Sequence, residues 1–138
     1  MKRVTGIGGI FFKSKDPIKS REWYNKHLGL STNEYGSLFE FRQGAKPEEK
    51  GYLQWSPMSK DTKYYEPSKS EFMINYRVDN LILLLKQLKE EGVKIVGEME
   101  EFEYGKFAWI MDDEGHKIEL WEPVDEVFTK DYEGKTTI

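Results

Sequence analysis

The sequence of 138 residues lacks cysteine altogether. This absence excludes a disulfide framework, a thiolate metal site and a cysteine nucleophile. The sequence also lacks any apolar run close to the roughly 18 residues that a membrane span requires, and residues 1–6 do not resemble the apolar part of a signal peptide. We therefore expect a cytoplasmic protein with no membrane association.

An excess of basic residues is missing as well. There are 21 Lys and Arg residues against 25 Asp and Glu, which gives a formal net charge of −4 and a pI of about 5.3. Nucleic acids and anionic membranes are bound by basic patches, so we expect neither as a partner. Hydrophobic residues make up only 38% of the chain, but 14% of its residues are aromatic, so rings must supply much of the buried surface. The length fits one domain or two small fused modules.

The segment 113–123 combines a turn with an alternating strand. Ile118 and Leu120 point to one side of this strand, whereas Glu119 and Trp121 point to the other. A glutamate on the open side of a half-buried sheet is ordinarily solvated. It gains a function only if that side lines a pocket.

Two helices are predicted from their capping residues. Asp16 is a favourable N-cap, Pro17 suits the first helical position, and Gly29 suits the C-terminal stop. The second helix is expected to begin at the N-cap Asp79 and to end at Gly92, with leucines at positions 81, 84, 85 and 88 on one face.

The two helices lie in units that repeat. The ranges 16–29 and 79–92 have the same length, and each follows an aromatic strand and precedes further strands. A strand–helix–strand–strand–strand unit that occurs twice is therefore our organising hypothesis. We predict a first module at 1–60, a connector at 61–70, a second module at 71–123 and a C-terminal tail at 124–138. The strands are predicted at 7–13, 38–42, 51–55, 72–78, 93–100, 106–111 and 117–122.

Four stretches resemble the vicinal oxygen chelate superfamily, which includes glyoxalase I, bleomycin-resistance proteins and extradiol dioxygenases. They are 11–17 (FFKSKDP), 23–30 (WYNKHLGL), 76–79 (YRVD) and 112–120 (DDEGHKIEL). The resemblance implies an α+β fold in which two βαβββ modules form a curled, eight-stranded mixed sheet. This sheet would be a cup with helices outside and a pocket inside, and it is usually completed or flanked by a two-fold partner. We therefore expect a homodimer.

In metal-dependent members of this superfamily, four side chains on four strands hold one divalent ion. Carried over by position, these side chains fall at Gly9, Gln54, Met73 and Glu119. Glycine has no donor, and a thioether does not suit Mg²⁺, Ni²⁺ or Zn²⁺. We therefore expect a member without metal or other cofactor.

Strand alternation predicts which residues face the pocket. On the first strand Ile7, Gly9 and Phe11 share a face, and the Gly8-Gly9 pair indicates a bulge or a close approach. The parity of 106–111 is open: either Ala108 or the neighbouring rings face inward. The predicted catalytic residues are Glu119 and Arg77, and the predicted ligand-binding residues are Phe11, Tyr52, Gln54, Met73, Asn75, Trp109 and Trp121.

A buried charge requires a partner, and strand parity favours Arg77 as the partner of Glu119, with Lys117 second. Tyr64, Tyr65 and Tyr104 lie in loops that could rim the opening. Aromatic residues at strand spacing also serve as ordinary core, so part of this set is expected only to pack.

Three functions fit the sequence. The first is a binding protein that holds a small hydrophobic or aromatic molecule without metal, as bleomycin-resistance proteins do. The second is a metal-independent lyase or isomerase with Glu119 as general base and Arg77 stabilising the anion. The third, a metal-dependent glyoxalase-like lyase, is disfavoured by Gly9 and Met73. The sequence does not decide between the first two.

Overall fold

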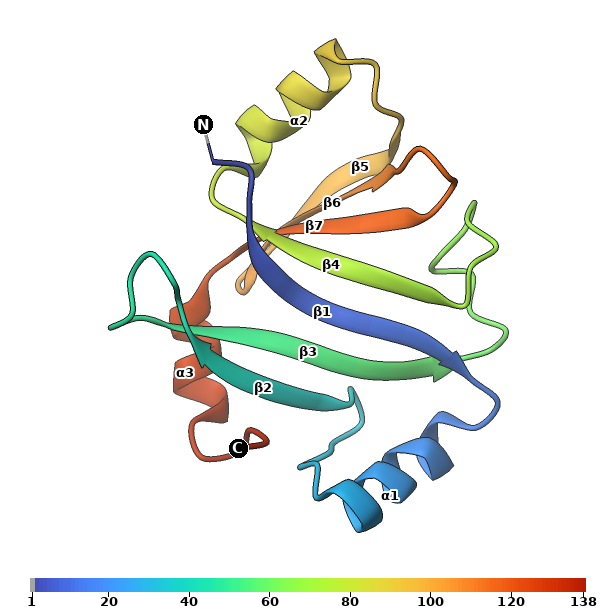
Figure 1. Cartoon of the computed structure of the whole chain (residues 1–138), viewed down its shortest axis with the longest axis vertical. Helices are drawn as coiled ribbons and strands as arrows, with labels where there is room; N and C mark the ends of the chain where they lie inside the picture. The colour runs from blue at the N-terminus through green and yellow to red at the C-terminus, as the bar shows by residue number, and fades with distance from the viewer. Residues whose placement is uncertain (1) are drawn as a thin grey trace.

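The computed structural model describes residues 2–138 (Figure 1). In chain order its elements are β1 (Val4–Ser14), α1 (Pro17–Leu28), β2 (Ser37–Arg42), β3 (Lys50–Ser59), β4 (Phe72–Val78), α2 (Leu81–Glu90), β5 (Ile95–Phe102), β6 (Gly105–Met111), β7 (Lys117–Pro123) and α3 (Asp125–Tyr132). None of the described helices is long and apolar enough to cross a membrane.

The strands form one mixed sheet in the order β2-β3-β1-β4-β7-β6-β5. This sheet has seven strands and is not closed, so the predicted eight-stranded sheet is wrong by one strand. Between α1 and β2 the chain forms only an isolated bridge, Asn33 to Gly36. Gly36 has a positive φ of 120°, and β2 begins at the next residue, so a tight turn stands where a further strand was expected. The first unit is therefore βαββ and the second βαβββ.

The strand register aligns four residues across the middle of the sheet. Gln54 is the neighbour of Gly9, Gly9 of Asn75, and Asn75 of Glu119, on β3, β1, β4 and β7 in turn. Side chains at such opposed positions share a face. Strands that are far apart in the sequence thus contribute to one side of the sheet.

The predicted bulge on β1 is present, between Ile7 and Gly9. Because of the bulge, Ile7 lies opposite Tyr76, on the same face of the sheet as Ile10, which lies opposite Ile74. The expectation that Ile7 and Gly9 share a face is therefore wrong, because the extra residue of a bulge reverses the alternation.

The first helix begins and ends as predicted. Asp16 accepts a hydrogen bond from the Lys19 backbone nitrogen, and Gly29 has φ 72°. The N-cap of α2 is Asn80 rather than Asp79, because the chain stays extended for one more residue and the Asn80 side chain accepts from Leu83. Both residue types are good caps, so the sequence alone does not separate them.

The face of α2 packs on one side of the sheet. Leu81, Leu84 and Leu88 lie in one buried cluster with Ala108 and Leu120. Burying a leucine side chain contributes roughly 1.5–3 kcal/mol. Ala108 therefore points to the same side of the sheet as α2. The rings of Phe107 and Trp109, on either side of it in β6, point to the opposite, inner face.

The third helix lies within the stretch predicted as a C-terminal tail. Figure 1 shows α3 behind the sheet, on the side away from the viewer. Its Phe128 stacks with Tyr52, with ring centroids 5.5 Å apart, and meets the ring of Trp121 edge-on at 5.5 Å. The expectation that all helices lie outside the cup is therefore wrong for α3. Its apolar side chains are too few to stand out in the sequence.

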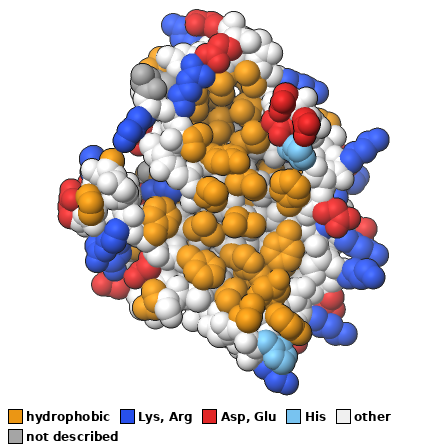
Figure 2. Space-filling view, viewed as in Figure 1, with side chains coloured by type: hydrophobic (Ala, Val, Ile, Leu, Met, Phe, Trp, Pro, Cys, Tyr) orange, Lys and Arg blue, Asp and Glu red, His pale blue; other side chains and the backbone are white. Residues whose placement is uncertain are grey.

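The outer face of the sheet is largely apolar. Figure 2 shows a band of hydrophobic side chains down this face. Ile7, Ile10 and Phe72 belong to the outer face and are 42%, 39% and 43% exposed.

Candidate small-molecule site

The inner face of the sheet and α3 enclose a cavity of about 1050 Å³, which we call the cup. This volume lies just above the range of roughly 300–1,000 Å³ that is usual for small-molecule pockets. Ten of its lining residues are aromatic: Phe11, Tyr35, Tyr64, Phe102, Tyr104, Phe107, Trp109, Trp121, Phe128 and Tyr132. Such walls favour a ligand with a flat apolar body.

Glu119 lies in the wall of the cup and is only 3% exposed. Its Oε1 accepts a hydrogen bond from Asn75 Nδ2 at 2.7 Å. Its Oε2 accepts from Trp109 Nε1 at 2.9 Å and from the hydroxyl of Tyr64. The predicted inward orientation of Glu119 is confirmed.

Register explains two of these three contacts. Asn75 is the neighbour of Glu119 across β4 and β7, and Trp109 is its neighbour across β6 and β7. Tyr64 comes instead from the loop between β3 and β4, and its side chain extends over the carboxylate. It was expected only at the rim, since loop positions have no strand parity from which to predict a contact.

The predicted pairing of Arg77 with Glu119 is wrong. Arg77 forms a bidentate ion pair with Asp125, at 2.9 Å from Nη1 to Oδ1 and 2.5 Å from Nη2 to Oδ2. Its guanidinium also lies over the rings of Phe41 and Trp121, at 5.2 and 5.4 Å. The neighbour of Arg77 in the sheet is the bulky Trp121, and α3 begins at Asp125, so the nearest carboxylate comes from the helix.

Lys117, the second predicted partner, does not pair with Glu119 either. Its Nζ donates to the carbonyl oxygen of Tyr64 at 2.7 Å and lies over the rings of Tyr64 and Trp109. Burial lowers the pKa of Lys117, and the charge of Glu119 partly opposes this shift. Across residues 2–138, Glu119 is held by neutral donors and forms no ion pair.

The negative charge of Glu119 acts across the cup. Burial raises the pKa of Tyr64, Tyr65 and Tyr104, and Glu119 raises each of these pKa values further. Glu100 adds to the effect on Tyr64 and Tyr104. These hydroxyls therefore stay protonated and remain donors at neutral pH.

Gly8 allows the strands to approach closely beside Glu119. A Cβ at this position would collide with the amide oxygen of Asn75 and lie 2.7 Å from Trp121 and 2.9 Å from Arg77. That amide oxygen is buried and has no hydrogen-bond partner. The absence of a side chain at Gly8 thus keeps Asn75 in place to bind Glu119.

The donor set does not fit a hard divalent cation. Of the four carried-over positions, Gly9 has no side chain and Met73 packs in an apolar cluster with Tyr65 and Trp109. Gln54 uses its Nε2 on backbone carbonyls of the β2–β3 region. No three acidic or histidine side chains gather as a metal site in the described part of the chain. One carboxylate with amides is less than such a metal requires.

Six of the nine predicted site residues line the cup: Phe11, Gln54, Asn75, Trp109, Glu119 and Trp121. The other three, Tyr52, Met73 and Arg77, do not. Tyr52 is 1% exposed and bonds Thr129 of α3 through its hydroxyl at 2.7 Å. The residues missed by sequence reasoning come mainly from the end of β3, from the β5–β6 hairpin and from α3, and Phe107 would have followed from the correct parity of β6.

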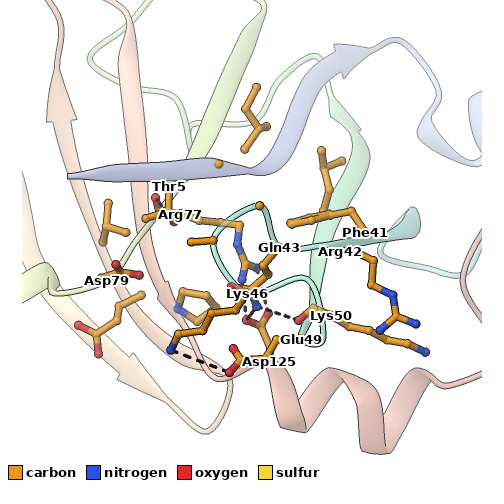
Figure 3. A pocket seen from close by; sticks show the side chains of 18 of the residues that line it. Thr5, Phe41, Arg42, Gln43, Lys46, Glu49, Lys50, Arg77, Asp79 and Asp125 are labelled. Atoms are coloured by element: carbon orange, nitrogen blue, oxygen red, sulfur yellow. Dashed lines mark hydrogen bonds and ion pairs between the residues drawn. The ribbon is translucent and has the colours of Figure 1, made fainter. Parts of the chain in front are cut away.

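Arg77 lines a second cavity of about 1490 Å³ (Figure 3). This cavity lies around the ion pair with Asp125, between the start of β1 and the loop from β2 to β3. Its charged side chains are mixed in sign, with six basic and seven acidic residues. In Figure 3 Arg77, Gln43 and Asp125 converge at its centre.

Solved structures of proteins from several bacteria share this fold. A methylmalonyl-CoA epimerase from Mycobacterium tuberculosis shares 23% identity, with 92% of this chain and 93% of that chain covered and a TM-score of 0.58. A Streptomyces coelicolor methylmalonyl-CoA epimerase variant in complex with 2-nitronate-propionyl-CoA shares 16%, with 88% and 99% covered and a TM-score of 0.60. A superfamily member from Vibrio splendidus shares 13%, with 84% and 97% covered and a TM-score of 0.53. These identities are low and establish the fold alone.

No curated protein sequence matches the chain. The family profile described as "Glyoxalase/Bleomycin resistance protein/Dioxygenase superfamily" matches residues 6–120, which is most of its length. The chain belongs to the glyoxalase/bleomycin resistance protein/dioxygenase superfamily.

Proposed function

We propose that this protein binds a small, flat aromatic or hydrophobic molecule in the cup without a metal ion, and that Glu119 is the polar anchor of the site. The observation that carries the proposal is a buried carboxylate, held by neutral donors, in the wall of an aromatic cavity. Binding pockets combine apolar walls with a few convergent polar groups, and the cup has this composition.

Glu119 is stabilised differently from an ordinary buried structural acid. A buried charge is costly, and an ion pair is the usual compensation. The chain has Arg77 on the neighbouring strand but pairs it with Asp125. Glu119 is left with neutral donors only, beside a space that a ligand can occupy.

Tyr64 is the element that would control access to Glu119. It covers the carboxylate through its hydroxyl, yet the residue is 38% exposed and comes from a loop. Rotation of Tyr64 alone would uncover Oε2 while Asn75 and Trp109 stay in the sheet. A ligand donor could then replace the tyrosine hydroxyl.

A second candidate is a metal-independent enzyme in which Glu119 abstracts a proton from an activated C–H group. Three donors occupy three of the roughly four acceptor positions of a carboxylate, so one on Oε1 is free to act as a base. The epimerases among the similar structures catalyse an isomerisation on the same fold. Arg77 is engaged by Asp125, so Tyr64 and Trp109 are the donors left to stabilise an anion. The binding role requires fewer assumptions.

Screening a library of aromatic fragments by thermal shift, followed by crystallography of the hits, tests the proposal. We expect ligands in the cup, with a polar atom within hydrogen-bond distance of Glu119. Hits that bind only outside the cup, or no hits, would contradict it. Ni²⁺, Zn²⁺ and Mn²⁺ should leave the Tm unchanged, whereas one bound equivalent of metal that is lost in Glu119→Ala would overturn the metal-free assignment.

We also propose a homodimer formed through the outer face of the sheet. The band in Figure 2 exposes several large aliphatic side chains, and exposed patches of this kind mark interaction sites. A two-fold axis can place such a face against its own copy. Sedimentation at micromolar concentration should give a dimer, and Ile10→Lys should give a monomer while Met99→Lys does not. A wild-type monomer, with stability independent of dilution, would contradict this assembly.

A further inference from the structure

The charged residues around the cup are almost all acidic. Six carboxylates and one guanidinium line it: Glu34, Asp61, Glu100, Glu103, Glu119, Asp131 and Arg21. The whole chain carries a net charge of only −4. The second cavity has nearly balanced charges, so the acidity of the cup is a local property and does not simply reflect the composition.

None of these six carboxylates forms an ion pair within the described residues 2–138. The ion pairs there involve other acids, such as Asp125, Glu101 and Glu122. Lys117, which lies beside the Tyr64 and Trp109 rings, does not line the cup. Clefts lined by charge of one sign concentrate ligands of the opposite sign.

The hydrogen-bond donors beside Glu119 are already in use. Asn75 Nδ2, Trp109 Nε1 and the Tyr64 hydroxyl all bond Glu119. The indole nitrogen of Trp121 donates to the carbonyl oxygen of Tyr104 at 3.0 Å. An anionic ligand would meet the Glu119 carboxylate, and the three donors that bond Glu119 would not be free to bind it. By contrast, the amide oxygen of Asn75 is a buried acceptor without a partner.

The walls can also hold a cation through their ring faces. Protein cations already lie over the rings of Tyr64, Trp109 and Trp121. Among the described residues, no Lys or Arg lies over four other rings that line the cup, Phe102, Tyr104, Phe107 and Phe128. Cations are attracted to aromatic faces, and this attraction is strongest where water is excluded. The helix α3 adds Phe128 and the carboxylate of Asp131 from outside the range that matches the family profile.

We propose that the molecule bound in the cup is a flat aromatic cation, recognised by the ring faces, by the charge of Glu119 and by the acidic rim. This inference rests on the proposed function, because it names the chemical class of the ligand at the same site. The rings bind the flat body, and the carboxylates select its charge.

The test uses three probes of similar shape and different charge: 10-methylacridinium, which is a permanent cation, acridine, which is neutral at pH 8, and 9-anthracenecarboxylate. We expect calorimetric titration at pH 8 to show 10-methylacridinium bound at least tenfold more tightly than acridine, a difference of about 1.4 kcal/mol. Part of this preference should be lost at high salt, because the rim carboxylates are exposed.

Variants show whether the preference comes from the cup. Glu100→Gln combined with Asp131→Asn should reduce the preference for the cation at least threefold. Glu98→Gln combined with Glu133→Gln removes the same total charge at positions that do not line the cup, and it should leave the preference unchanged. Equal loss in both pairs would overturn the inference, because net charge would then explain it.

The two possible failures are distinguishable. If acridine or 9-anthracenecarboxylate binds as tightly as the cation, the inference is wrong and the aromatic-binding function stands. If none of the three probes binds, the aromatic-binding function is wrong as well.

Discussion

Trp109 donates a hydrogen bond from its indole nitrogen to Oε2 of Glu119, its direct neighbour across β6 and β7, at 2.9 Å. The cross-strand pair of Trp109 and Glu119 thus joins the aromatic wall of the cup to its buried carboxylate. The indole nitrogen of Trp121 instead donates to a neutral acceptor, the carbonyl oxygen of Tyr104. The two tryptophans are both buried, at 7% and 3% exposed, and differ in what their nitrogens bind.

Trp109→Phe should therefore destabilise the protein more than Trp121→Phe. Each change removes similar ring area, but only the first removes a donor from a buried charge. Hydrogen bonds to charged groups are worth about 1.5–3 kcal/mol, against about 0.5–1.5 kcal/mol for neutral pairs. Urea denaturation of the two variants measures the difference. Equal losses would show that the charge of Glu119 does not depend on this donor.

Asp125→Asn should lower the free energy of unfolding by about 3–5 kcal/mol, toward the lower end because the Asp125 side chain is 19% exposed. The cause is that Arg77, whose side chain is 5% exposed, would keep a buried charge without its partner. Glu126→Gln, the adjacent exposed position on α3, is the control and should change stability by less than about 0.5 kcal/mol. If the two variants unfold at the same denaturant concentration, the ion pair does not hold α3.

High pH should reveal the two tyrosines, Tyr64 and Tyr65, whose pKa values are raised. The folded-state pKa values of Tyr64 and Tyr65 are raised above the ordinary value of 10.0. Their neutral forms therefore favour the folded state fully below pH 10, and this stability is lost as the pH rises above 10. In a titration of tyrosine absorbance, these two groups should ionise only when the protein unfolds. In the double variant Tyr64→Phe, Tyr65→Phe, the part of the absorbance change that accompanies unfolding should be smaller by two tyrosines. An unchanged absorbance step would contradict the raised pKa values of these two residues.

Much of this fold could be predicted from the sequence, because its signals were local. Asp16 and Gly29 cap α1 as expected, and the alternation around Glu119 placed it on the inner face. The second cap was off by one, since Asp79 and Asn80 are equally suitable and the end of β4 decides between them. The eighth strand was expected from the resemblance, and a turn at Gly36 replaces it.

The contacts within the site were harder to predict from the sequence. The partner of Arg77 is Asp125, which is distant in sequence and lies on a helix that carries little periodic signal. Tyr64 reaches Glu119 from a loop, where residue spacing gives no direction. Strand periodicity identified the face of the cup, whereas the loop and α3 that close it depend on tertiary packing.

Gly8→Ala should weaken ligand binding and stability together. The new methyl group would collide with Asn75 and Trp121, which moves the amide away from Glu119. Overpacking of this kind costs about 1–3 kcal/mol. Gly44→Ala, where a Cβ would meet nothing within 4 Å, is the matched control and should behave as wild type. An unchanged affinity and Tm in Gly8→Ala would mean that Asn75 is not fixed by this contact.

The most direct test of Glu119 as the anchor of the cup is the affinity of Glu119→Gln for the tightest aromatic compound from the library screen, measured by calorimetry beside Glu98→Gln. Glutamine keeps the size of the side chain and removes its charge, while one amide donor now faces other donors, at a cost of about 1–3 kcal/mol in stability. Glu119→Gln should give a folded protein that binds at least tenfold more weakly than wild type, with Glu98→Gln unaffected. A Glu119→Gln protein that is as stable as wild type and binds the compound equally well would contradict it.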